Sequence, residues 1–265
     1  MIANYGVGVN HIDLSAAASH GITVSNTPGV LTDATADLTL TLMLMLCRRA
    51  GEGERELRAG EWSGWRPTHL VGRQMTGKTL GIIGMGRIGR AVAHRAHFGF
   101  GMEIVFQNRS PVDDGAGVGG RQLASVAEVC AASDFVSLHC AATPETRHIL
   151  GREALAAMSP SAYVINTARG DVVDEDALVA ALESGAIGGV GLDVFQGEPK
   201  VNPAIMAAPN TVLLPHLGSA TEETRVAMGM KVVENARAFA MGEALPDKVG
   251  CCLLYTSDAA DDHHR

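Results

Sequence analysis

Short apolar segments alternate with helix-like segments along the chain from Gly77 to Pro215, and this alternation restricts the fold more than any other feature. The apolar segments are 80–83, 103–106, 135–138, 163–165, 190–194 and 212–214. The helix-like segments between them are 88–98, 123–132, 152–158 and 175–184. Continuous apolar strands that alternate with helices predict a parallel sheet covered on both faces. We therefore expect an α/β fold with a doubly wound parallel sheet of the Rossmann type.

Composition and charge exclude several classes of protein. The chain has 265 residues, of which 46% are hydrophobic and 19% charged, and its formal net charge is -8. An acidic balance argues against binding to nucleic acid, which needs clustered Lys and Arg. The five cysteines are odd in number and lack the spacing of a zinc site, so we expect no metal. The N-terminus lacks a signal peptide and the apolar run 38–47 is too short to span a bilayer, which predicts a cytoplasmic protein without membrane contact.

A glycine-rich turn follows the first apolar strand of the alternating region. Gly84-Met85-Gly86-Arg87-Ile88-Gly89 matches the pattern G-x-G-x-x-G between a strand and a helix. In this context Gly84 permits the tight turn, Gly86 lets a pyrophosphate approach the backbone, and Gly89 lets the helix pack on the strand. The N-terminus of the following helix, which includes Arg87 and Ile88, supplies N–H groups and a partial positive charge. We predict a dinucleotide site here; the alternative is a glycine-rich turn without a ligand.

The end of the second strand bears on the choice of cofactor. An NAD-selective site places an acidic residue about 20 residues beyond the glycines, where it binds the ribose 2′-hydroxyl. This chain has Asn108 at that place, followed by Arg109 and Ser110, which can bind a 2′-phosphate. We therefore expect NADP(H) to be preferred, with NAD(H) as a second cofactor. The alternative is that Arg109 is a solvated surface side chain.

Three further strand ends carry polar residues that suit the reduction of a 2-oxo acid. Arg169 follows one strand, Asp193 and Glu198 follow the next, and His216 follows the last. Ligands of open α/β sheets bind outside the carboxyl ends of the strands, so these side chains can converge beside the cofactor. Histidine is the natural proton donor near neutral pH, a carboxylate beside it orients the ring, and arginine offers a planar fork to a substrate carboxylate.

At these residues the sequence resembles the D-isomer-specific 2-hydroxyacid dehydrogenases, and within that family the glyoxylate/hydroxypyruvate reductase branch. The resemblance extends from Ala3 to about Val249. It is carried by the segments 4–13, 84–89, 165–170, 193–195, 198–199 and 215–221.

The resemblance implies roles for individual residues of the substrate and cofactor sites. Arg169 binds the substrate carboxylate and carbonyl, Glu198 is the partner of the histidine, and His216 is the acid/base. Val7 and Gly8 match a loop whose backbone holds the substrate carboxylate. The residues on the cofactor side are Thr143, Pro144, Thr167, Ala168, Asp193 and Gly218.

The family also suggests a domain arrangement. Its members begin with a flavodoxin-like half-domain well before Ala3, so we expect residues 1–27 to be a remnant of the substrate domain, with one short strand pair and one short helix, in an N-terminally truncated chain. Residues 28–217 form the NAD(P)-binding domain, with a dimerisation helix at 31–48 and a long packed arm at 60–77. Residues 218–250 form a closing helix that returns to the substrate domain. Residues 251–265 resemble the read-through of a sequencing adapter.

Three functions remain open from the sequence. The first is an enzyme, a homodimer that reduces glyoxylate, hydroxypyruvate or a similar small 2-oxo acid. A formate dehydrogenase is disfavoured, because Glu198 stands where that branch has glutamine and Leu217-Gly218-Ser219 follows the histidine. The second is a dinucleotide-binding sensor or corepressor-like protein without catalysis. The third is a fragment that binds cofactor without turnover.

Overall fold

The computed structural model describes residues 1–250, and the predicted adapter-like segment, Cys251–Arg265, lies outside the described residues. The chain divides into two compact units. The larger unit is Thr35–Gly218, and the smaller unit combines Met1–Ala34 with the segment that starts at Ser219.

The strands of the larger unit are β3 (Thr79–Ile83), β4 (Glu103–Gln107), β5 (Arg121–Gln122), β6 (Phe135–Leu138), β7 (Tyr163–Asn166), β8 (Gly189–Leu192) and β9 (Thr211–Leu213). They form one parallel sheet in the order β5-β4-β3-β6-β7-β8-β9. The first six strands follow the Rossmann order 3-2-1-4-5-6. The order reverses between β3 and β6, which is where such sheets bind ligands. The predicted fold class is therefore confirmed.

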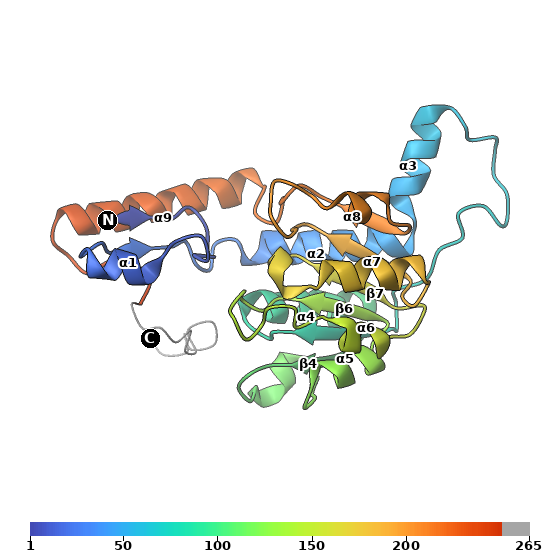
Figure 1. Cartoon of the computed structure of the whole chain (residues 1–265), viewed down its shortest axis with the longest axis horizontal. Coiled ribbons are helices and arrows are strands. Elements are labelled where there is room, and N and C mark those ends of the chain that lie inside the picture. The colour runs from blue at the N-terminus through green and yellow to red at the C-terminus, as the bar shows by residue number, and fades with distance from the viewer. Residues whose placement is uncertain (251–265) are drawn as a thin grey trace. The chain divides into compact units, whose positions relative to one another are not determined.

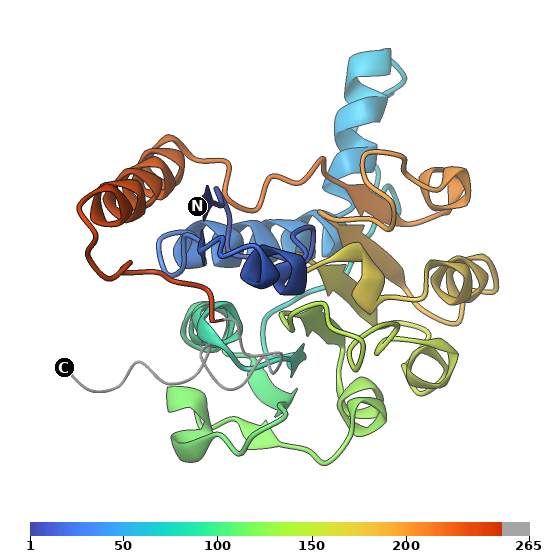
Figure 2. The same ribbon diagram turned by 60° about the vertical axis from the view of Figure 1, so that its left-hand side comes forward.

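Helices cover both faces of this sheet (Figures 1 and 2). They are α2 (Thr32–Cys47), α4 (Arg87–Phe100), α5 (Val126–Ala132), α6 (Arg152–Ala156), α7 (Glu175–Glu183) and α8 (Pro203–Ala207), with short 3-10 helices at Asp113–Gly117 and Gly170–Val172. Helix α3 (Ala50–Ala59) has no buried residue and extends away from the sheet (Figure 1). One buried apolar cluster joins the sheet to α5, α6 and α7, and the other joins it to α2 and α4. Strands β6, β7 and β8 are buried at every residue, which explains why they read as continuous apolar runs.

Local sequence accounts for most of the helix starts. Ser125 and Asp174 accept hydrogen bonds from backbone N–H groups of the first turns of α5 and α7. Helix α4 differs, because its N-cap residue is Gly86 and no side chain caps it. Its first N–H groups therefore remain available to an anion at the carboxyl end of β3.

The structure departs from the sequence predictions in five places. Strand β5 and helices α3 and α8 were not predicted. The arm at 60–77 is less packed than expected, since the side chains of Trp62 and Trp65 are 53% and 83% exposed. Helix α2, which as a predicted dimerisation helix was expected to expose apolar surface, instead packs most of its apolar side chains into the core.

The smaller unit contains β1 (Ile2–Ala3), β2 (Val24–Ser25), α1 (Leu14–Ser19) and α9 (Glu222–Ala240). Strands β1 and β2 form a parallel pair, as the sequence predicted, and Asp247 to Val249 hydrogen-bond along β2. The Asp247 carboxylate is bound by Lys231 and Asn235 of α9, which fixes the chain after that helix to this unit.

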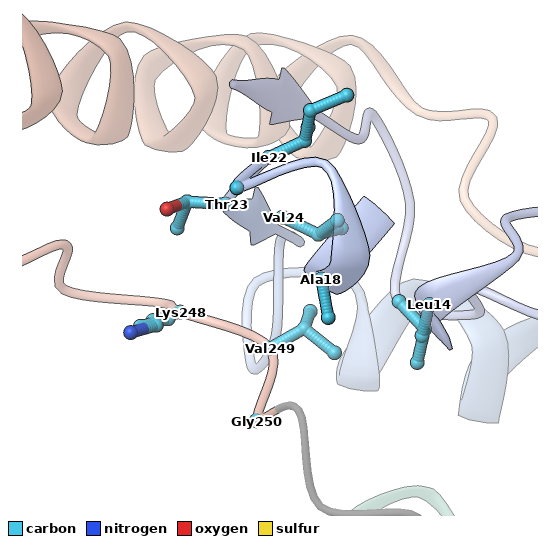
Figure 3. Close-up of a pocket in the computed structure, with 9 residues that line it drawn as sticks. Leu14, Ala18, Ile22, Thr23, Val24, Lys248, Val249 and Gly250 are labelled. Carbon is cyan, nitrogen blue, oxygen red and sulfur yellow. The ribbon is translucent and has the colours of Figure 1, made fainter. Parts of the chain in front are cut away.

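A cavity of about 220 Å³ lies in the smaller unit (Figure 3). Most of its lining is aliphatic, and among the described residues that line it Lys248 is the only charged one. The close-up shows the Lys248 side chain extending away from Leu14 and Ala18. The cavity therefore offers no acid/base pair, and the candidate site lies elsewhere. Among residues 1–250 no helix is both long and apolar enough to cross a membrane.

Candidate active site

The glycine loop between β3 and α4 is packed against backbone from two directions. Gly84 has a φ of +96°, and a Cβ there would lie 2.7 Å from the Cys140 nitrogen. A Cβ on Gly89 would lie 2.3 Å from the Gly84 carbonyl oxygen. Larger residues would push α4 away from β3, so the glycines keep the helix N-terminus close to the strand end.

Asn108 ties the end of β4 to this loop. Its Oδ1 accepts a hydrogen bond from the Met85 N–H at 3.1 Å, and its Nδ2 donates to the Ser110 carbonyl at 3.1 Å. Arg109 and Ser110 are exposed beyond it. The two strand ends predicted to meet a dinucleotide are thus joined by a side chain.

This part of the larger unit fits a dinucleotide. An uncapped helix N-terminus, a turn with no room for a Cβ, and an exposed cation at the second strand end are the features a pyrophosphate and a ribose phosphate require. In the described part of the chain no group of His, Cys, Asp and Glu could hold a metal ion.

His216 and Glu198 are in direct contact. The ring Nδ1 of His216 lies 2.8 Å from Glu198 Oε2, while Glu198 Oε1 accepts the Phe195 N–H at 2.9 Å. The side chains are 50% and 35% exposed, so a ligand can reach the ring. Because Nδ1 faces the carboxylate, Nε2 is the ring nitrogen left to exchange a proton with a ligand.

Asp193 holds the turn that carries His216. Its carboxylate accepts the N–H groups of Leu217 and Gly218 at 2.6 and 2.8 Å, and its carbonyl accepts the His216 N–H at 2.9 Å. His216 itself has a φ of +57°, an uncommon conformation for a residue with a side chain. Burial raises the pKa of Asp193 above its ordinary value, and the bonds from Leu217 and Gly218 oppose that rise.

Arg169 stands at the end of β7 and is half-buried. Asn166 stabilises the turn before it, since its Nδ2 donates to the Arg169 carbonyl and its Oδ1 accepts the Ala168 N–H. The Arg169 guanidinium donates to the Ala168 carbonyl at 2.6 Å. The residue is therefore placed at the same sheet edge as Glu198 and His216, as predicted from the strand ends.

Hydroxyl groups of α2 connect two of these strand ends. Thr35 donates to the Gly218 carbonyl at 3.0 Å, and the hydroxyls of Thr39 and Thr167 lie 3.0 Å apart. All four residues are buried. The sequence indicated Thr167 and Gly218 by resemblance but gave no reason to select the two threonines of the helix.

Thr143 and Pro144 lie in the loop after β6, where the Thr143 N–H donates to the Thr146 hydroxyl at 2.8 Å. Val7 and Gly8 belong to the smaller unit. Asn4 donates to the carbonyls of Gly6 and Gly8, and Asn26 donates to that of Val7. Sequence reasoning missed both asparagines, although Asn4 opens the segment that carried the resemblance.

From His139, at the end of β6, we expect acid to destabilise the folded protein. Burial lowers its pKa to about 3, and its Nε2 lies 2.8 Å from the Ser137 hydroxyl. The unfolded chain protonates this histidine near pH 6.5, whereas the folded chain does so only near pH 3. The contribution of the neutral histidine to the free energy of unfolding is therefore fully present above pH 6.5 and is lost as the pH falls toward 3. We expect His139→Gln to lose less stability than the native protein between pH 7 and pH 5 in urea unfolding. Equal losses in the two proteins would contradict this.

Comparisons with known proteins agree with this arrangement. Residues 40–218 match the model of the family "D-isomer specific 2-hydroxyacid dehydrogenase, NAD binding domain". The chain is 46% identical over 261 residues to a glyoxylate reductase of Thermococcus litoralis, which covers 97% of this chain and 78% of that protein.

Two solved structures are similar over most of the chain. One is an NADPH-dependent glyoxylate/hydroxypyruvate reductase of Sinorhizobium meliloti in complex with NADP and malonate, with a TM-score of 0.87, 39% identity, and coverage of 94% of this chain and 77% of that one. The other is a glyoxylate reductase of Paecilomyes thermophila, with a TM-score of 0.85, 42% identity, and coverage of 94% and 75%. The chain therefore belongs to the D-isomer-specific 2-hydroxyacid dehydrogenase family and is an NAD(P)-dependent oxidoreductase.

Proposed function

We propose that this protein reduces glyoxylate, hydroxypyruvate or a similarly small 2-oxo acid with NADP(H). The observation that carries the proposal is the contact of His216 with Glu198 at the end of the sheet that also bears the glycine loop. The relatives named as glyoxylate reductases support the choice of substrate.

The roles of the residues follow from their chemistry. When bound, the nicotinamide cofactor supplies a hydride to the carbonyl carbon. His216, as the imidazolium, gives the proton on Nε2 to the carbonyl oxygen, and Glu198 stabilises the charged ring through Nδ1. Arg169 binds the substrate carboxylate with its planar fork of N–H groups and polarises the carbonyl.

The test is the oxidation of NADPH by residues 1–265 with glyoxylate, followed at 340 nm, beside a titration of NADPH binding to the same protein. We expect binding and glyoxylate-dependent oxidation together. Binding without oxidation by glyoxylate or hydroxypyruvate would contradict turnover by this chain and favour one of the two alternatives, a dinucleotide-binding protein without catalysis or a fragment that binds cofactor without turnover.

The preference for NADP(H) rests on the end of β4. Asn108 leaves the 2′ position uncharged, and the exposed Arg109 and Ser110 can bind a phosphate there. A charged hydrogen bond is worth about 1.5–3 kcal/mol, or roughly ten- to a hundredfold in affinity. NADPH should therefore bind more tightly than NADH by about that factor.

Asn108→Asp combined with Arg109→Leu should reverse this preference. The aspartate loses the bond that the Asn108 amide donates to the Ser110 carbonyl, but its carboxylate can accept both the Met85 N–H and a free 2′-hydroxyl, while its charge repels a 2′-phosphate. Nicotinamide fluorescence titrations of both cofactors measure the ratio. Arg87→Leu, at the first residue of α4, is the matched control, and it should weaken the binding of both cofactors alike. Equal affinity of the native protein for both cofactors would refute the NADP assignment.

The remaining expectations stay proposals. The exposed side chains of Trp62, Trp65 and Val71 support a homodimer formed through the arm at 60–77. The domain bounds, the substrate-binding role of Val7 and Gly8, and the cytoplasmic location likewise remain predictions.

A further inference from the structure

Gln122, on the edge strand β5, makes three hydrogen bonds to the loop 108–112, which follows β4 and carries Arg109 and Ser110. Gln122 Nε2 donates to the Asn108 carbonyl at 3.1 Å and to the Ser110 carbonyl at 3.2 Å. Its Oε1 accepts the Val112 N–H at 2.9 Å. We propose that Gln122 is a positioning residue for cofactor selectivity, which holds the loop 108–112 in the conformation that presents Arg109 and Ser110 to the 2′-phosphate of NADP(H).

The two bonds that Gln122 donates end on the carbonyls of Asn108 and Ser110, the residues directly before and after Arg109. Each hydrogen of the Gln122 amide serves one of the carbonyls on either side of that residue, and the Ser110 carbonyl also accepts a hydrogen bond from the Asn108 side-chain amide. A carbonyl oxygen turned toward a phosphate would repel it. Gln122 holds the Asn108 oxygen, and together with the Asn108 amide it holds the Ser110 oxygen, which keeps that repulsion away from the site.

Backbone planarity extends the effect. In a trans peptide the C=O and the following N–H point in opposite directions, so an Asn108 carbonyl directed at Gln122 turns the Arg109 N–H away from β5. Pro111 has no N–H and limits the conformation of Ser110 before it. The third bond, from the Val112 N–H, fixes the chain directly after the proline.

The place of Gln122 in the sheet suits this role. Strand β5 pairs with β4 over only two residues, Arg121 with Val105 and Gln122 with Phe106. Gln122 thus sits beside the strand whose end carries the loop, 14 residues away along the chain from Asn108. Such a short strand contributes few pairing bonds to the sheet. Its contribution is to hold the Gln122 side-chain amide at a fixed distance from the loop 108–112.

The inference rests on the proposed preference for NADP(H), and the test separates the two. NADPH and NADH are titrated by nicotinamide fluorescence against the native protein, Gln122→Met and Gln122→Glu. Methionine keeps the length and volume of the side chain and removes all three bonds. Glutamate keeps the acceptor for the Val112 N–H and removes both donated bonds. Arg121→Leu, the neighbour whose side chain points to the opposite face of β5, is the control.

We expect Gln122→Met to lower the affinity for NADPH about tenfold and the affinity for NADH less than about twofold, so that the preference for NADPH becomes smaller than in the native protein. Gln122→Glu should weaken NADPH at least as much, since it also adds a negative charge, and Arg121→Leu should leave the ratio unchanged. A native preference that survives in both Gln122 variants, or an equal loss of both cofactors, would overturn the role of Gln122 alone. A native protein with no preference would overturn the NADP assignment and this inference together.

Discussion

Replacing His216 with alanine should lower kcat/KM for glyoxylate by about two to four orders of magnitude, the usual worth of general acid–base catalysis. The ring stands on a turn held by Asp193, with Nδ1 on Glu198 and Nε2 left for the ligand. Removing the ring takes away the proton donor but leaves the glycine loop untouched. The affinity for NADPH should therefore stay within about twofold of the native value.

Two further variants make this test specific. His94→Ala removes an exposed histidine of α4 in the same unit and should leave kcat/KM unchanged. Glu198→Gln keeps a hydrogen-bond acceptor beside Nδ1 but removes the charge, so its loss should be smaller than that of His216→Ala. Turnover of His216→Ala near the native level would refute the acid/base role, whatever the effect of Glu198→Gln.

Gly170→Ala is expected to cost about 3 kcal/mol of folding stability or more, because the added methyl group meets backbone that cannot move aside. Its Cβ would lie 2.0 Å from the Phe195 carbonyl carbon and 2.3 Å from the Gln196 nitrogen. Gly170 directly follows Arg169, and Phe195 donates its N–H to Glu198. One methyl group would thus separate the two strand ends that carry these side chains, and activity should fall with stability.

Gly99→Ala is the matched control for this variant. Gly99 lies inside α4, and a Cβ there would have no atom within 4 Å. Alanine at a helical position of this kind should gain about 0.5–1 kcal/mol relative to glycine. Urea unfolding measures both changes, and a Gly170→Ala variant as stable as Gly99→Ala would show that the close approach at Phe195 is not required.

The sheet was predictable from the sequence because its strands are buried on both faces. Each of the long strands reads as an apolar run, and each predicted run overlaps a strand of the structure by at least two residues. Strand β5 has only two residues, and helix α3 contains two glycines and no buried side chain, so neither produces an apolar periodicity. These elements depend on contacts that a one-dimensional pattern does not contain.

The candidate site was predictable to the extent that strand ends of a parallel sheet share one edge. This reasoning selected Arg169, Glu198 and His216, and the structure places the last two in contact. The supporting side chains were not predictable in the same way. Gln122 and Thr39 lie far along the chain from the residues that they hold, and nothing in their own neighbourhood separates them from other polar residues.

The strand order has a consequence for engineering this protein. Four interstrand spacings of about 4.8 Å separate β4, whose end we propose to select the cofactor, from β8, whose end precedes Asp193 and Glu198. The two ends are therefore roughly 19 Å apart, beyond the range over which substitutions usually influence each other. We therefore expect substitutions that change cofactor preference and substitutions that change proton transfer to act independently, so that their free-energy effects add when they are combined.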